Sequence, residues 1–90
     1  MNLNSKIKIS EDLFVEKIDN EIVLLDTQTQ EYFSLSEVGI VIWDILSDEK
    51  ELRKVHNKLI DLYDVDSVQL ENDLLNFIEV LVNKKLIYVD

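Results

Sequence analysis

Between residues 12 and 35 the chain alternates short apolar runs with turn-forming residues. Asp19-Asn20 separates the first two runs, and the polar stretch 26–30 precedes the third. Asp and Asn favour turns because their side chains bond nearby backbone and tolerate a positive φ. The runs are rich in β-branched and aromatic residues, which indicates strands. The pattern predicts a three-stranded antiparallel meander with strands around Leu13–Val15, Ile22–Leu25 and Tyr32–Phe33.

After Leu35 the apolar residues follow a helical period. Ser36 is placed to cap the first free N–H groups of a helix that ends near Leu46. Trp43 falls off the centre of the apolar stripe of this helix, where a large ring can seal the junction between helix and sheet. We expect the buried stripe to consist of Val38, Ile42, Ile45 and Leu46.

Two further helices are predicted in the second half. Asp48 and Glu51 have the spacing of a capping box, so a second helix begins near Asp48. Asp66 or Ser67 then caps a third helix that ends near Asn83. The C-terminal run Leu86–Val89 is β-prone and either adds a terminal strand or packs across the helices.

The third helix carries two apolar rows, displaced by about 100° around its axis. A helix between two layers would bury both rows in the core. Alternatively, the second row is left partly open as one wall of a groove. The first row is Leu70, Leu74, Phe77, Ile78 and Leu81, and the second is Val68, Leu75 and Val82.

This order of elements predicts a single α+β domain over residues 1–90, winged-helix-like, with an N-terminal three-stranded antiparallel sheet followed by three helices. Many such domains bind DNA, but the net charge of −10 repels phosphate backbones and anionic lipid. The exposed charges of the third helix would be Glu71, Asp73 and Glu79, which makes a recognition helix in a major groove electrostatically unfavourable. We therefore expect a protein or peptide partner, no nucleic acid and no membrane.

Catalytic chemistry finds little support in the sequence. There is no cysteine and only one glycine, so a thiol nucleophile, a thiolate metal site and a glycine-rich phosphate loop are all excluded. The single histidine, His56, is expected to be a partly exposed helix residue. We predict no enzyme activity, no metal and no cofactor. With neither a signal-peptide run nor a membrane span, a cytoplasmic protein is expected.

The third strand offers a binding function instead. It is followed by a helix without pairing again, so its outer edge can accept an extended peptide, whose backbone gives affinity and whose side chains give specificity. The same edge could instead lie in the middle of the sheet, or be covered by the C-terminal run. It could also pair with a second copy to form a homodimer.

The stretch from Val23 to Gly39, with Ile42-Trp43 and Leu46, resembles the PqqD-like family of leader-recognition domains in pathways of ribosomally synthesised, post-translationally modified peptides. Three positions depart from the family pattern. Gln30 and Lys85 stand where glycine is usual, so both turns are expected to differ in geometry, and Ser36 stands where asparagine is usual. The resemblance continues through Tyr63–Asp66, Asp73-Leu74-Leu75, Phe77, Leu81 and Leu86-Ile87.

The resemblance implies that a precursor leader adds as a strand to the third strand and packs against the third helix. Glu79 and Asp73 could hold a basic residue of the leader. Carried over by position, the strand residues are Glu31, Tyr32, Phe33, Ser34 and Leu35, and the helix residues are Asp73, Leu75, Ile78, Glu79 and Val82.

Within the family, the length of the chain and its Leu-Leu-Asp-to-Tyr stretch are more similar to the leader-binding proteins of lasso-peptide clusters than to the pyrroloquinoline quinone chaperone. That likeness implies a leader peptidase and an ATP-dependent cyclase as companions. In other clusters the companion would be a radical S-adenosylmethionine enzyme. A homodimerising structural module and a winged-helix regulator are the alternative functions.

Overall fold

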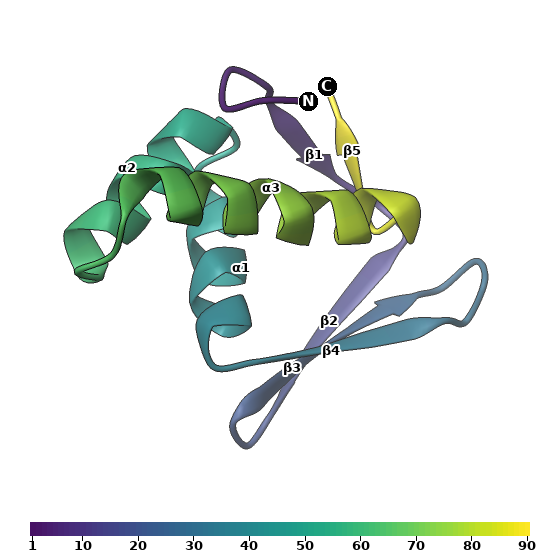
Figure 1. The fold of residues 1–90 in the computed structure, drawn as a ribbon. Helices are drawn as coiled ribbons and strands as arrows, with labels where there is room; N and C mark the ends of the chain where they lie inside the picture. The colour runs from purple at the N-terminus through teal and green to yellow at the C-terminus, as the bar shows by residue number, and fades with distance from the viewer.

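The computed structural model describes residues 1–90 and has five strands and three helices. The meander forms an antiparallel sheet in the order β2-β3-β4, as predicted, and β1 pairs with β5 in a separate two-stranded sheet. The helices gather on one side of the three-stranded sheet (Figure 1). The elements are β1 Ile7–Ile9, β2 Leu13–Ile18, β3 Glu21–Asp26, β4 Tyr32–Ser36, α1 Val38–Asp48, α2 Leu52–Leu62, α3 Ser67–Asn83 and β5 Ile87–Val89.

The three-stranded sheet buries one face. Successive strand residues point to opposite faces, and in β3 Ile22 and Leu24 are buried whereas Val23 and Leu25 are only half-buried. The buried face contributes to one core of 16 apolar residues, to which α1, α2 and α3 add Leu46, Leu59 and Leu74. The C-terminal run reaches this core through Ile87 while β5 pairs with β1.

The start of α1 differs from the prediction. Ser36 does not cap the helix, because it still belongs to β4 and pairs with Glu21 in the sheet. The N-cap is Glu37, with φ of 53° and no side-chain hydrogen bond to the helix. Val38 is 48% exposed and so lies outside the buried stripe, whereas Trp43 is buried.

The capping box predicted for α2 does not form. Asp48 is the last residue of α1, and Glu51 is the N-cap of α2 without a side-chain hydrogen bond. The N-terminal segment contacts this junction instead: Ile7 N donates to Lys50 O at 2.8 Å, and Leu52 N donates to Ser5 O at 3.1 Å. A partner distant in sequence has replaced the local cap.

The start of α3 confirms one of the two predicted caps. The Asp66 carboxylate accepts hydrogen bonds from Val68 N and Gln69 N at 2.9 and 3.0 Å. His56, expected to be partly exposed, is buried, and its Nε2 lies 3.0 Å from Ser67 O. Because a carbonyl only accepts, this histidine nitrogen carries the proton and ties α2 to the first turn of α3.

The two turns that lack the family's glycine keep the backbone conformation that glycine favours. Gln30 and Lys85 have φ of 62° and 61°, so the expected change of turn geometry is wrong. Lys85 follows the last turn of α3: its N–H donates to Val82 O, and Leu86 N donates to Leu81 O. These two bonds form a Schellman motif, in which a left-handed residue ends the helix.

Candidate functional site

The outer edge of β4 has no strand beside it. β4 pairs only with β3, and the C-terminal run that could have covered it pairs with β1. The edge is therefore neither central nor covered, which answers the two alternatives left open by the sequence.

The hydrogen bonds of the sheet determine which backbone groups β4 presents. Asp26 N donates to Glu31 O at 2.9 Å, so Glu31 faces β3. Since the bonding direction alternates along an antiparallel strand, Phe33 and Leu35 also bond to β3. The N–H and C=O groups of Tyr32, Ser34 and Ser36 point outward from the sheet and are available to an added strand.

The helix α3 passes beside this edge in the opposite direction to β4 (Figure 1). Near the start of β4, Lys84 Nζ lies 5.5 Å from the centroid of the Phe33 ring. Near its end, Leu35 and Phe77 meet at Gly39, where an added Cβ would lie 3.6 Å from Leu35 Cβ and 3.7 Å from Phe77 Cε2. Phe77 and Lys84 therefore mark the side of α3 that faces β4.

Two further residues share that side of α3. Helix positions 73, 77, 80 and 84 are separated by three or four residues, which places them on one face. Val80 is 43% exposed and Phe77 half-buried, so the middle of this face is apolar. A charged residue lies at each end of this face, Lys84 at one and Asp73 at the other. The Asp73 carboxylate accepts a hydrogen bond from Gln69 Nε2 at 2.9 Å. We call these four residues the strand-facing side of α3.

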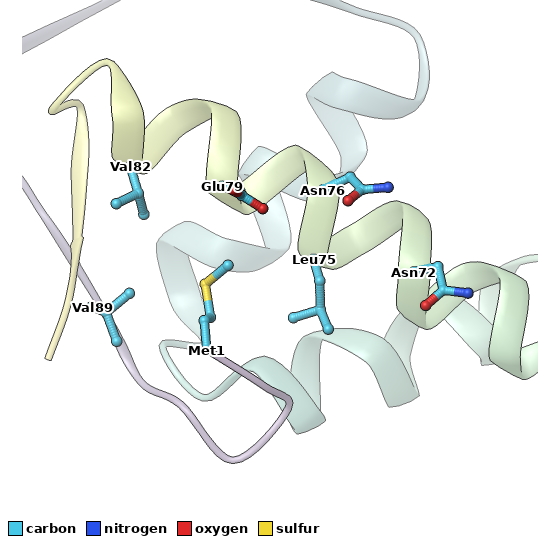
Figure 2. A pocket seen from close by; sticks show the side chains of 7 residues that line it. All are labelled: Met1, Asn72, Leu75, Asn76, Glu79, Val82 and Val89. Atoms are coloured by element: carbon cyan, nitrogen blue, oxygen red, sulfur yellow. The ribbon is translucent and has the colours of Figure 1, made fainter.

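The second apolar row does not form the wall beside β4, contrary to the interpretation from the sequence. Leu75 and Val82 lie two positions from Phe77 and Lys84, and two helix positions are about 200° apart. With Glu79 they instead line a separate pocket of about 710 Å³ (Figure 2). The pocket is lined by Met1, Asn72, Leu75, Asn76, Glu79, Val82 and Val89, none of which belongs to β4.

Two other candidate residues lie in the core. The Leu35 side chain is 3% exposed and that of Ile78 is fully buried, so neither side chain can contact a peptide on the surface. Leu35 remains part of the edge strand through its backbone. Glu31, Tyr32 and Ser34 are exposed and Phe33 is half-buried. Of the ten candidates, four lie in β4 (Tyr32, Phe33, Ser34 and Leu35), Glu31 directly precedes it, and Asp73 lies on the strand-facing side of α3 by its helical position.

Phe77, Val80 and Lys84 are not among the residues that the sequence resemblance implies for the site. Phe77 was counted with the buried row, and it is the member of that row that lies toward β4. Val80 belongs to neither row but lies three residues from Phe77 on the same face of α3, and this pair was the available signal.

The rest of the molecule adds no reactive constellation. No three His, Cys, Asp or Glu side chains are grouped so that they could hold a metal ion. None of the helices is long and apolar enough to cross a membrane.

An edge strand flanked by a helix is an arrangement with which domains take up an extended peptide as an additional strand. The chain belongs to the PqqD family: the family described as coenzyme PQQ synthesis protein D matches residues 21–87. No match was found among the curated proteins.

Two solved structures are similar to the whole domain. TbiB1 in complex with the TbiA(beta) leader peptide has a TM-score of 0.84 at 39% sequence identity, covering 92% of this chain and 99% of TbiB1. A lasso peptide synthetase B1 complexed with the leader peptide has a TM-score of 0.83 at 23% identity, covering 92% of this chain and 98% of the other. The second likeness, at its lower identity, concerns the fold alone.

Proposed function

We propose that this chain binds the leader segment of a ribosomally made precursor peptide, taking it up as an additional strand on β4 without catalysing a reaction. The observation that carries the proposal is the likeness to TbiB1, a leader-peptide complex that matches 92% of this chain at 39% identity. Membership of the PqqD family and the uncovered edge of β4 support it.

In the proposed complex the backbone and the side chains have separate tasks. The outward groups of Tyr32, Ser34 and Ser36 form hydrogen bonds with the leader, each worth about 0.5–1.5 kcal/mol net. The strand-facing side of α3 contacts alternate leader side chains, with Phe77 and Val80 supplying the apolar surface. Backbone pairing gives general affinity, and the contacts to α3 select the leader.

The pocket of Leu75, Glu79 and Val82 is outside this binding site. A strand paired with β4 lies on the other side of α3, so it cannot reach these side chains. The leader site proposed here therefore keeps Asp73 from the sequence prediction and replaces the second row by Phe77, Val80 and Lys84.

We further propose that the bound leader is presented to a processing enzyme of the same pathway. Strand addition holds only the few leader residues that lie along β4, and the rest of the precursor stays free for the enzyme. The resemblance of the sequence to the leader-binding proteins of lasso-peptide clusters favours a lasso-peptide pathway, with a leader peptidase and a cyclase as companions. In another class of pathway the companion would be a radical S-adenosylmethionine enzyme.

The test is a titration of the full chain with fluorescent synthetic leaders from the peptide clusters of the same genome. We expect saturable binding of one leader and no binding of a duplex DNA control, because the net charge of −10 opposes the phosphate backbone. Binding of DNA with no binding of any leader would contradict the proposal and favour a winged-helix regulator.

A homodimer is the second candidate, because the free β4 edge can pair with its own copy. Size-exclusion chromatography separates the two functions. A dimer that persists and does not bind saturating leader would support pairing of β4 with its own copy. A monomer that binds leader supports the proposal.

A further inference from the structure

The charges on the strand-facing side of α3 are arranged along the direction of β4. Asp73 and Lys84 are eleven residues apart, which is about 16 Å along a helix. Because α3 runs opposite to β4, Lys84 lies at the Tyr32 end of the strand and Asp73 toward the Ser36 end. The apolar Phe77 and Val80 lie between the two charges.

Both charges lack an ionic partner within the chain. The structure has two ion pairs, Lys17 with Asp44 and Lys54 with Glu51, and neither involves α3. Lys84 Nζ instead lies over the Phe33 ring, which holds the ammonium beside the strand. Asp73 accepts one hydrogen bond from the uncharged Gln69 amide, which leaves its negative charge uncompensated.

We infer that Lys84 and Asp73 select a leader with two opposite charges, an acidic side chain placed at Lys84 and a basic side chain placed at Asp73. This inference rests on the proposed function, and it adds the charge pattern of the ligand. A strand advances about 3.3 Å per residue, and only alternate residues point toward α3. The 16 Å span therefore corresponds to a separation of four or six leader residues.

The order of the two charges follows from the direction of the added strand. The sheet β2-β3-β4 is antiparallel throughout, and sheets tend to remain of one kind. An antiparallel leader enters near Ser36 and leaves near Tyr32. The basic residue therefore precedes the acidic residue in the leader.

The experiment is a charge-swap titration, using the leader that binds the unaltered chain. Lys84→Glu and Asp73→Lys are compared with Lys58→Glu and Asp61→Lys, which make the same charge changes on exposed positions of α2. We expect each α3 variant to weaken binding about tenfold and each α2 control to change it less than about twofold, because distant exposed charges are screened.

Complementary substitutions in the leader then locate the partners. Replacing one acidic leader residue with lysine should restore binding to the Lys84→Glu chain. Replacing one basic residue, four or six positions earlier, with glutamate should restore binding to the Asp73→Lys chain. Such rescue also shows that the variants are folded.

Three results would overturn the inference while leaving leader binding intact: equal losses in the α3 and α2 variants, no rescue by any single leader substitution, or a binding leader without such a charge pair. If no leader binds the unaltered chain, the proposed function fails first and the inference fails with it.

Discussion

Replacing Ser34 with proline tests strand addition at β4 most directly. The Ser34 N–H points away from β3, so the sheet does not use it, and proline is tolerated on an edge strand in that position. We expect the free energy of unfolding to change by less than about 1 kcal/mol. The ring removes the central donor of the edge and occupies the path of an incoming backbone.

The expected loss of affinity follows from the carbonyl that this donor would satisfy. A buried acceptor left without a partner costs about 1–3 kcal/mol, and the ring also displaces the neighbouring bonds. A total of about 2–3 kcal/mol corresponds to a Kd raised roughly 30- to 150-fold. Fluorescence anisotropy with the labelled leader measures this change, and circular dichroism melts confirm that the variant is folded.

Val15→Pro is the matched control on the opposite edge of the same sheet. Thr27 N donates to Asp12 O at 2.9 Å, and by alternation from that bond the Val15 N–H points away from β3. The control should bind leader as the unaltered chain does. Normal binding by folded Ser34→Pro, or an equal loss in both variants, would refute strand addition at β4.

Four other substitutions test the site and the fold. Leu75→Asp and Val82→Asp should leave leader affinity within about threefold, because their pocket lies on the other side of α3; a complete loss by anisotropy would return these residues to the leader site. Asp66→Ala should lower the free energy of unfolding by about 1 kcal/mol, because it removes the cap of α3. This corresponds to a melting temperature lower by about 4–8 °C, and an unchanged melting temperature would show that the cap contributes nothing. Lys85→Gly should stabilise the chain by about 0.5–1 kcal/mol, because glycine adopts the left-handed backbone without strain. Lys85→Ala keeps Cβ and should not stabilise it. Equal unfolding free energies of the glycine and alanine variants would contradict this.

The fold was predictable where local signals and packing agree. The short apolar runs separated by turn residues predicted β2, β3 and β4. Asp66 caps α3 as expected, because its hydrogen-bond partners lie only two and three residues away. The caps of α1 and α2 were not predictable from local signals. Ser36 is the last residue of β4, opposite Glu21 of β3, and the N-terminal segment bonds to the start of α2. Both effects join residues distant in sequence.

The site was predictable on the strand and not on the helix. The helix that follows β4 favoured an edge strand, and the pairing of β5 with β1 then excluded the alternative that the C-terminal run covers it. On α3 apolar or amphipathic residues flank the buried row on both sides, Leu75 and Val82 on one and Phe77 and Lys84 on the other. Only the packing of α3 on the sheet determines which flank meets β4, and helical periodicity carries no such information.

Net charge distinguishes the two occupants of the β4 edge. Two copies of this chain would bring together two bodies that each carry a charge of −10, which opposes pairing of their edges at low salt. A leader held by Lys84 and Asp73 is attracted at the same edge. Salt at about 1 M shortens the screening length to about 3 Å, so it should weaken leader binding and strengthen any dimer. A complex with leader that tightens with salt would mean that apolar contacts to Phe77 and Val80 outweigh both charges.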